Sequence, residues 1–478
     1  MQPLLLLAFC TFLFSLVYTP LCRDLFRKWG VFDHPDADRK IHSQPIPRVG
    51  GVVMVLALGS TYVVSLLLRG RIQPMAGMDL AWRVLPGAGI VFLTGLLDDW
   101  ISLKPWQKFA GQLLGAGWAY LAGLQVSGAA GFTAQHWLSL PLTLFWLVLC
   151  TNAFNLIDGV DGLATGVGLF ATLTMVLAAF LQHSLPLAAV TLPLAGFLLG
   201  FLRYNFNPAN VFLGDSGSLL IGFLLGCFGV IWSDKSATLL GMTAPLMAMF
   251  VPLLDVGLSV VRRFLRHQPI FDADRGHIHH RLLDRGLTPR GAVLLLYGAC
   301  TLGALFSIAQ TFAAQQYAGL IVLVFCATTW IGIQHLGYVE FSVASRMLLT
   351  GSFQRMLDAQ LQMRHFEQAL SEATTVDECW TQLTEGCRKF GFDGVNIYFR
   401  GRVLEDELAG SEEVPRWTVS IPLPEGGQAE LMRRFDASED GLMVAPMVRI
   451  LREHLPRKLT ALVPEVAQRR AVVSQGGD

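Results

Sequence analysis

The sequence predicts an all-α polytopic membrane protein with about eleven transmembrane helices, followed by a small α+β domain. Three observations support this fold class. The 478 residues are 53% hydrophobic and only 15% charged, with a mean hydropathy of +0.48, whereas a soluble domain carries about 25% charged residues. Several long stretches contain no Asp, Glu, Lys or Arg. Near residue 340 the composition changes abruptly, and glutamate appears for the first time.

The uncharged stretches set the expected membrane crossings, because a transmembrane helix needs about 20 apolar residues. Three of these stretches are long enough for two crossings each. The first stretch has neither a basic leader nor a cleavage signal, so we expect it to be a retained span. The eleven candidate helices are residues 2–21, 49–68, 84–97, 109–126, 137–152, 162–181, 186–202, 217–233, 238–260, 291–312 and 317–336, of which the third is short.

The charges divide the loops between two faces. The loops of one face hold 16 Lys and Arg, against four on the other, so the positive-inside rule places the richer face in the cytoplasm. Of the 15 Asp before residue 340, 13 lie on that same face. Short carboxylates beside many basic side chains indicate a cation and an anionic substrate, although surface solvation is the simpler alternative. The formal net charge of zero gives no reason to expect nucleic acid.

Two adjacent carboxylates, Asp98 and Asp99, end the third span and precede Lys104 and Lys108. Charges at a membrane boundary are costly unless they are paired, hydrated or functional. The pair could orient a cation or take a proton from a phosphate. A solvated helix terminus explains a lone pair equally well.

The connection between the fifth and sixth spans supplies amide and carboxylate oxygens. Its polar side chains are Asn152, Asn155, Asp158 and Asp161, with glycines at 159 and 162. The glycines allow tight turns and a close approach of a ligand to the backbone. The spacing and closing Glu of a calcium-binding EF-hand are absent. We expect a ligand-binding segment, with a structural turn as the alternative.

A third segment, from Phe212 through Gly214 and Asp215 to Ser218, stands directly before a span. Its small residues leave room for a phosphate or a metal near a helix N-terminus, where the helix dipole favours anions. Asp215 is a natural ligand for a hard cation. Ser216 and Ser218 could instead cap the helix, which leaves Asp215 unexplained.

The largest cytoplasmic loop contains three histidines, His277, His279 and His280, interleaved with Arg275 and Arg281. Zinc is one candidate ligand, but zinc sites usually draw on more widely separated residues. Arginine forms bidentate contacts with phosphate oxygens. We therefore favour phosphate binding over zinc.

The first loop adds three cationic side chains, Lys40, His42 and Arg48, before Gly50 and Gly51. Taken alone, it could be an ordinary basic loop beside the membrane. The eight cysteines form no CxxC pair, so they indicate neither a zinc site nor a disulfide framework.

Together and in this order, the five segments resemble the polyprenyl-phosphate N-acetylhexosamine-1-phosphate transferase family over residues 1–336. The NAFNLIDGVDGLA and FLGDSGS segments are highly specific to it. The resemblance implies a bacterial inner-membrane enzyme with a cytoplasmic active site. It would transfer N-acetylglucosamine-1-phosphate, or a related amino-sugar-1-phosphate, from a UDP-sugar to undecaprenyl or another polyprenyl phosphate. UMP would be released, as the first membrane step of a cell-surface glycan pathway.

The resemblance also implies roles for individual residues. Asp215 matches the position that binds Mg²⁺, for which Mn²⁺ is a candidate substitute. The expected catalytic residues are Asp98, Asp99 and Asp158, and which aspartate of the adjacent pair acts stays open. The expected substrate-binding residues are Lys40, Arg48, Lys108, Asn152, Asn155, Asp161, Phe212, His277, His279, His280 and Arg281. The HIHHRL element is similar to the common-antigen and teichoic-acid branch of the family, which favours UDP-N-acetylglucosamine as donor. A homodimer is a further expectation.

The remaining residues predict a helical linker at 337–373, a soluble cytoplasmic α+β domain at 374–464 and a disordered tail at 465–478. Within the domain, Thr375 should cap a helix that runs to Lys389. Strands are expected at 394–399 and 416–422, and a helix near 444–454. The segment Cys387–Phe399 resembles part of a GAF-type sensory domain, with a module for self-association as the alternative.

Two other classes of protein fit the composition. A polytopic transporter often has internal repeats and charges near the middle of the membrane, but here the acids cluster at one face and the sequence shows no repeat. A membrane-anchored sensor would act through the C-terminal region, which leaves the Asp-rich loops without a purpose.

Overall fold

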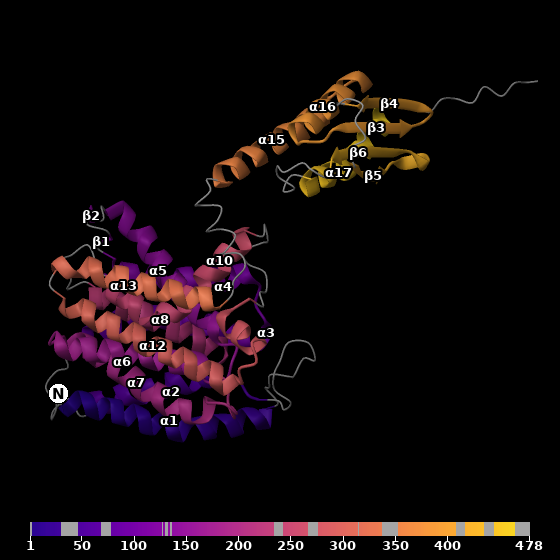
Figure 1. Ribbon diagram of the computed structural model, residues 1–478. Coiled ribbons are helices and arrows are strands. Elements are labelled where there is room, and N and C mark those ends of the chain that lie inside the picture. Colours follow the sequence, from indigo (N-terminus) through magenta and orange to yellow (C-terminus); the bar gives the residue numbers. More distant parts are fainter. Residues whose placement is uncertain are drawn as a thin grey trace, which may run out of the picture. The chain divides into compact units, whose positions relative to one another are not determined.

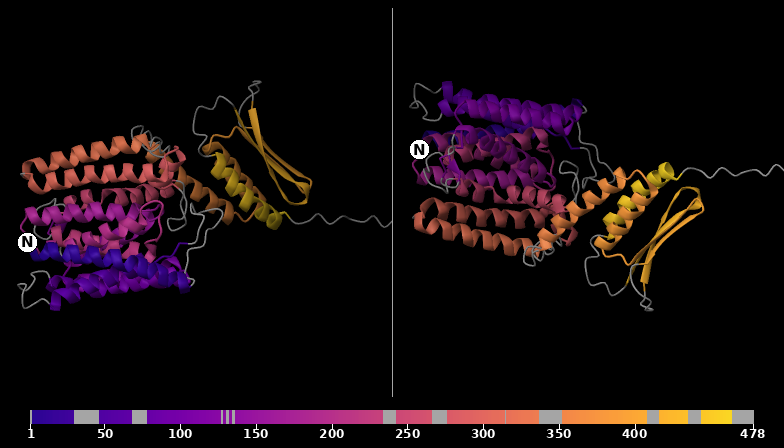
Figure 2. Two further views of the ribbon diagram at one scale, coloured as in Figure 1. Left: turned by 90° about the horizontal axis from the view of Figure 1, so that it is seen from below. Right: turned by 90° about the horizontal axis from the view of Figure 1, so that it is seen from above.

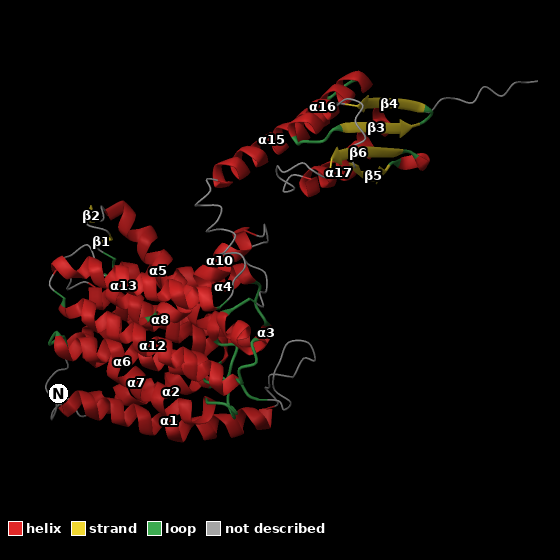
Figure 3. Cartoon of the chain, viewed as in Figure 1, coloured by secondary structure: helices red, strands yellow, loops and turns green. Residues whose placement is uncertain are grey.

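The computed structural model describes the chain in two compact units, residues 1–340 and 341–478, which are considered separately (Figures 1 and 3). The described residues are 2–29, 46–67, 78–126, 128–129, 132–133, 136–233, 242–265, 276–313, 315–336, 352–407, 416–434 and 444–463.

The first unit consists of helices that lie side by side along a common direction (Figure 1). They are α1 (Gln2–Trp29), α2 (Gly50–Leu67), α3 (Met78–Ile101), α4 (Pro105–Leu121), α5 (His136–Ile157), α6 (Leu163–Leu181), α7 (Leu185–Asn205), α8 (Gly214–Ser233), α9 (Thr243–Ala248), α10 (Phe250–Leu265), α11 (Ile278–Asp284), α12 (Pro289–Phe312) and α13 (Gln315–His335), with a hairpin of β1 (Gly128–Ala129) and β2 (Phe132–Thr133) before α5.

Among the described residues, nine helices are long and apolar enough to cross a membrane. The chain is therefore a multi-pass membrane protein that is mostly helical. Helix α4 has 17 residues, and the expected crossing at 238–260 falls partly on α9 and α10, which Met249 separates. The number of eleven crossings thus stays a prediction. The third crossing, expected to be short, is the 24-residue helix α3, because the helix begins at Met78, before the apolar run, and continues after it through Asp98 and Asp99 to Ile101.

Helices α6, α7 and α8 form the centre of this unit. Between 78% and 89% of the residues in their apolar, membrane-spanning segments are buried, against 11% for α13. Their sequences are rich in Gly and Ala, and such small residues let membrane helices approach closely. A tight centre of this kind fixes the ends of α5, α6 and α8 relative to one another.

The second unit is a four-stranded antiparallel sheet with helices on one face (Figure 2). Its elements are α15 (Ser352–Glu372), α16 (Val376–Lys389), β3 (Gly394–Phe399), β4 (Arg402–Glu407), β5 (Arg416–Pro422), the short 3₁₀ helix η1 (Pro424–Gly426), β6 (Gln428–Arg434) and α17 (Val444–Leu462), and the strand order is β4-β3-β6-β5.

The structure confirms the two expected strands as β3 and β5, and the expected helix as α16. Strands β4 and β6 were not expected from the sequence, because Glu, Asp and Arg interrupt their apolar residues. The helical linker expected at 337–373 contains α15, and part of this linker and the C-terminal tail lie outside the described residues.

One apolar core holds the second unit together. Its buried side chains come from the strands and from the three long helices, and they include Leu370, Leu383, Leu431, Leu451 and Leu455. Helix α16 begins with a capping box, in which the Thr375 side chain accepts a hydrogen bond from the Glu378 N–H and the Glu378 side chain closes back on the Thr375 N–H. This unit therefore has a core of its own and a capped helix.

Candidate active site

The polar cluster of the first unit forms where α3, α4, α5 and α8 meet. Lys108, on α4, places its ammonium 2.6 Å from the Oδ2 atom of Asp215 and also pairs with Asp98. On the other side, the Asn155 amide donates to Oδ1 of Asp215 at 2.9 Å and to Ser218 Oγ at 3.0 Å. Three of the sequence motifs thus converge on the Asp215 carboxylate.

The two adjacent aspartates have different partners. Asp99 accepts hydrogen bonds from the backbone N–H groups of Asp215 at 2.9 Å and Ser216 at 3.0 Å, so it caps the first turn of α8 from another helix. Asp98 accepts from the Leu103 N–H at 2.7 Å and pairs with Lys108. The structure therefore gives the two carboxylates different roles: Asp99 caps the start of α8, and Asp98 faces the Lys108 ammonium.

Close contact between α3 and α8 makes this arrangement possible. A Cβ atom at Gly95 would lie 2.6 Å from both the Asp215 carbonyl oxygen and the Ser216 Cα atom. Both atoms belong to backbone and cannot move aside easily. Only glycine at this position lets α3 bring its aspartates to the start of α8.

The chain before α2 joins the same cluster through its backbone. Arg48 and Phe212 form a parallel bridge, in which the Phe212 N–H donates to the Pro47 carbonyl at 3.0 Å and the Val49 N–H donates to the Phe212 carbonyl at 3.2 Å. The Arg48 guanidinium lies 3.8 Å from Asp99. Lys40, which was expected to bind substrate, lies outside the described residues.

Two further residues that were expected to bind substrate, Asn152 and Asp161, also have partners within the protein. The Asn152 amide exchanges two hydrogen bonds with Gln112 of α4, at 2.6 and 3.2 Å. Asp161 accepts from the Asn207 side chain at 3.1 Å and from the Ala209 N–H at 3.0 Å. The first contact ties α4 to α5, and the second fixes the loop that leads to the Phe212 bridge.

Asp158 lies at the end of α5, half-buried in the turn before α6. Burial, reinforced by the negative charges of Asp215 and Asp99, raises the pKa of the Asp158 carboxyl well above its usual range. Such a raised pKa is typical of a carboxyl that takes part in binding or proton transfer.

The histidine element, which comprises residues 277–282 (HIHHRL), lies beside the same turn. The rings of His277 and His279 are stacked with centroids 5.7 Å apart, and His280 lies 4.3 Å from His279. A Cβ atom at Gly159 would lie 2.9 Å from His279 Nε2, so this glycine gives the imidazole its place beside the Asp158 turn. Burial, together with the nearby His280, lowers the pKa of His279 to about 3, and the ring is therefore neutral at pH 7.

Comparison with known proteins identifies the family. Residues 81–233 match the family model described as glycosyl transferase family 4. A probable undecaprenyl-phosphate N-acetylglucosaminyl 1-phosphate transferase of Bacillus subtilis is 35% identical over 298 residues, which cover 61% of this chain and 80% of the relative. The chain belongs to the polyprenyl-phosphate N-acetylhexosamine-1-phosphate transferase family.

Two further members of this transferase family show the range of similarity. A decaprenyl-phosphate N-acetylglucosaminephosphotransferase of Mycobacterium tuberculosis is 34% identical, over 60% of this chain and 78% of the relative. A phospho-N-acetylmuramoyl-pentapeptide-transferase of Latilactobacillus sakei is 30% identical, over 49% of this chain and 76% of the relative.

The charges and ligand atoms of the transferase cluster fit a divalent cation. Four carboxylates, on Asp98, Asp99, Asp158 and Asp215, gather around two cationic side chains, on Lys108 and Arg48. The described residues include no ready-made group of three His, Cys, Asp or Glu for a metal. Mg²⁺ does not need one, since it is usually bound by one or two carboxylates together with substrate phosphates. The oxygens of Asp215 are of the kind that it takes.

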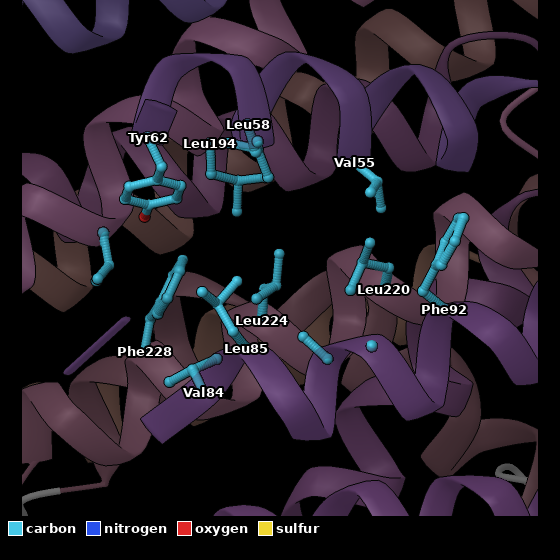
Figure 4. A pocket seen from close by; sticks show the side chains of 14 residues that line it. Val55, Leu58, Tyr62, Val84, Leu85, Phe92, Leu194, Leu220, Leu224 and Phe228 are labelled. Atoms are coloured by element: carbon cyan, nitrogen blue, oxygen red, sulfur yellow. The ribbon is translucent and has the colours of Figure 1, made fainter. Parts of the chain in front are cut away.

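An apolar groove of about 270 Å³ lies in the membrane-spanning part of the transferase, apart from this polar cluster. Residues of α2 and α3, including Leu58, Tyr62, Leu85 and Phe92, point into it from opposite sides, and α7 and α8 complete its lining (Figure 4). None of the lining residues is charged. The groove is suited to hydrocarbon chains, and its lining offers no charged side chain for the phosphates of a nucleotide.

Three side chains that position the motifs were not predicted from the sequence. Gln112 pairs with Asn152, Tyr297 donates to the Gly162 carbonyl at 2.6 Å, and Asp255 pairs with His277. For Asp255 a signal was present, because a carboxylate within an otherwise apolar crossing is a functional candidate by default. For Gln112 and Tyr297 the sequence alone offers no distinguishing pattern.

Proposed function

We propose that the protein transfers N-acetylglucosamine-1-phosphate from UDP-N-acetylglucosamine to undecaprenyl phosphate or a similar polyprenyl phosphate, and that UMP is released. The observation that carries the proposal is the convergence of Asp98, Lys108, Asn155 and Asp215 at the ends of membrane helices in a member of this transferase family. Such a place lets a soluble nucleotide sugar meet a lipid phosphate.

The proposed reaction is a phosphoryl substitution. An oxygen of the lipid phosphate forms a bond to the β-phosphorus of the UDP-sugar, the bond from that phosphorus to the oxygen bridging the α-phosphate breaks, and UMP leaves with the electron pair. Two anions must approach each other, so the main task of the protein is to position them and to neutralise charge. Bound Mg²⁺ would supply part of that neutralisation at Asp215.

The side chains divide this task between the two substrates. Lys108, held by Asp98 and Asp215, offers a cation to phosphate oxygens and can exchange its carboxylate partners for them. We assign Asp98 to the acceptor phosphate, because Asp99 is engaged by the backbone of α8. We assign Phe212 to the uracil ring of the donor, and the histidine element with Arg281 to its pyrophosphate and sugar.

The relatives support N-acetylglucosamine as the sugar. The matches to the Bacillus subtilis and Mycobacterium tuberculosis relatives, which are named for transfer of N-acetylglucosamine phosphate, extend over 61% and 60% of this chain, whereas the match to the relative named for the muramoyl-pentapeptide extends over 49%. The HIHHRL element, at residues 277–282, favours the same branch. We place the site and the C-terminal unit on the cytoplasmic side of a bacterial inner membrane. The loops that carry the site motifs are those rich in Lys and Arg, and such loops are usually cytoplasmic.

Release of UMP by the purified full-length protein in detergent tests this function. The reaction contains undecaprenyl phosphate, Mg²⁺ and one of several UDP-sugars. We expect UMP, and not UDP, only when lipid and Mg²⁺ are both present, with the highest rate for UDP-N-acetylglucosamine. Asp215→Asn should abolish release while the protein still folds. If folded wild-type protein releases no UMP with any donor, the proposal is wrong.

A further inference from the structure

Helix α10 presents three buried polar side chains along one face. Asp255, Ser259 and Arg262 are spaced at i, i+4 and i+7, which places them on the same side of a helix, and at most 6% of the surface of each is exposed. Buried polar groups are costly unless they have partners. All three find theirs at the start of the histidine element.

Asp255 makes the strongest of these contacts. Its Oδ2 atom lies 2.8 Å from Nδ1 of His277, and its Oδ1 atom accepts a hydrogen bond from the Ile278 N–H at 2.7 Å. Ser259 Oγ lies 3.3 Å from the same imidazole nitrogen, and Arg262 donates to the Gly276 carbonyl at 2.9 Å. The face of α10 thus holds both the backbone and the ring of His277.

The chemistry of a carboxylate fixes the state of this ring. An ionised carboxylate can only accept hydrogen bonds, so the His277 Nδ1 atom must carry a hydrogen. The other nitrogen, Nε2, is then the one left to meet a ligand. It donates to a phosphate oxygen only when the ring carries a second proton, and the buried Asp255 carboxylate supplies the counter-charge for that imidazolium.

The orientation of the His277 ring affects the rest of the site through ring contacts. Its ring is stacked on that of His279 with an angle of 3° between the planes. His279 in turn lies against Gly159 in the turn that carries Asp158. A rotation of His277 would therefore disturb the surface against which the donor is expected to bind.

We propose that Asp255 is a positioning residue for the nucleotide sugar: it orients His277 and stabilises the charged imidazole that binds the donor pyrophosphate. This inference rests on the proposed function. A residue that only stabilised the fold would not need a charge, since well-packed hydrophobic residues in place of a buried ion pair are often equally stable or more so.

Asp255→Asn in the full-length protein tests this role. The amide keeps the size of the side chain but removes the charge. We expect the KM for the UDP-sugar and the Kd for UMP to rise about tenfold, by analogy with metal-binding histidines, for which loss of the carboxylate partner typically costs tenfold or more. The KM for the polyprenyl phosphate should stay within about twofold, because the side-chain hydrogen bonds of Asp255 within the described part of the chain go to the histidine element. Gly257→Ala, on the same helix with open space around its Cβ position, is the matched control.

A double-mutant cycle with His277→Gln decides whether Asp255 acts through His277. We expect Asp255→Asn to add little to the donor defect of His277→Gln. Three results would each overturn the inference. The effects of the two substitutions on the donor KM could multiply, the donor KM could be unchanged in Asp255→Asn, or the KM values for donor and lipid could rise equally. If Asp255→Asn does not fold, Asp255→Glu takes its place in the same cycle, because it keeps the charge and displaces the oxygens by one methylene.

The wild-type protein separates this inference from the function on which it rests. If the wild type releases no UMP, the proposed function fails. If the wild type is active and Asp255→Asn binds UMP as tightly as the wild type, the positioning role alone is wrong.

Discussion

At the scale of single residues, the structure gives the paired aspartates separate tasks. The Asp99 carboxylate holds two N–H groups at the start of α8, while Asp98 faces Lys108. The sequence identified the pair but could not assign a different role to each aspartate. Two adjacent aspartates are indistinguishable in the sequence until it is known which of them caps a helix. The decisive partners, Asp215 and Ser216, are more than 100 positions away in the sequence.

Substitution at the two positions should therefore have different effects. Asp99→Ala leaves two buried N–H groups without an acceptor and should destabilise the protein by about 1–3 kcal/mol. Asp98→Asn should lower turnover about 100-fold or more with little change in the melting temperature in detergent, because it removes a charge beside the reacting phosphate. Thermal unfolding and UMP release on both variants measure this, and the reverse pattern would refute the division.

A second prediction concerns Gly159. Its substitution by Ala places a methyl group 2.9 Å from the unmodified position of His279 Nε2, so the ring must shift. We expect the KM for the UDP-sugar to rise several-fold, about 1 kcal/mol in binding, with an unchanged KM for the lipid. Gly298→Ala, which meets open space, serves as the control. Unaltered donor kinetics in Gly159→Ala would show that the histidine element lies outside the donor site.

At the scale of elements, the site depends on how closely helix ends approach one another. The sequence predicted the nine described helices that are long and apolar enough to cross a membrane, the motifs at their ends and the strands β3 and β5, because uncharged apolar runs and turn residues are local features of short segments. It did not predict β4 and β6, whose charges hide the alternation, nor the cross-helix contacts of Gln112 and Asp255. Those contacts depend on the packing of distant segments, which no local pattern encodes.

The contact between α3 and α8 can be tested through two glycines of the same helix. Gly95→Ala would place its Cβ atom 2.6 Å from the backbone of Asp215 and Ser216, whereas Gly89→Ala meets nothing within 4 Å. We expect Gly95→Ala to lose about 1–3 kcal/mol of stability through overpacking, and most of its turnover. Gly89→Ala should match the wild type. Equal behaviour of the two variants in thermal unfolding and UMP release would argue against this contact.

At the scale of the whole molecule, the chain combines a membrane transferase with a C-terminal unit that has its own core. The family match covers residues of the first unit, and the second has a capped helix, a four-stranded antiparallel sheet and a buried cluster around Leu383. The sequence suggested a boundary from its composition alone, since charge returns where the membrane segments end. The resemblance to a GAF-type domain stays a prediction.

We expect the second unit to fold independently, because it has its own core. Residues 352–478 expressed alone should form a soluble protein with a cooperative unfolding transition. Leu383→Ala should destabilise it by about 2–5 kcal/mol, because the side chain is fully buried. Circular dichroism during chemical denaturation measures both. A chain without a cooperative transition would mean that this unit needs the membrane part in order to fold.

The most direct test of the central claim follows the β-phosphate of the donor. Full-length protein is incubated with undecaprenyl phosphate, Mg²⁺ and UDP-N-acetylglucosamine labelled at the β-phosphate, and the lipids are then extracted. Transfer of a sugar-1-phosphate carries the label into the lipid fraction, and we expect it there with the wild type and not with Asp215→Asn. Label that stays in the aqueous phase as UDP, while the sugar enters the lipid, would show transfer of the sugar alone and contradict this account.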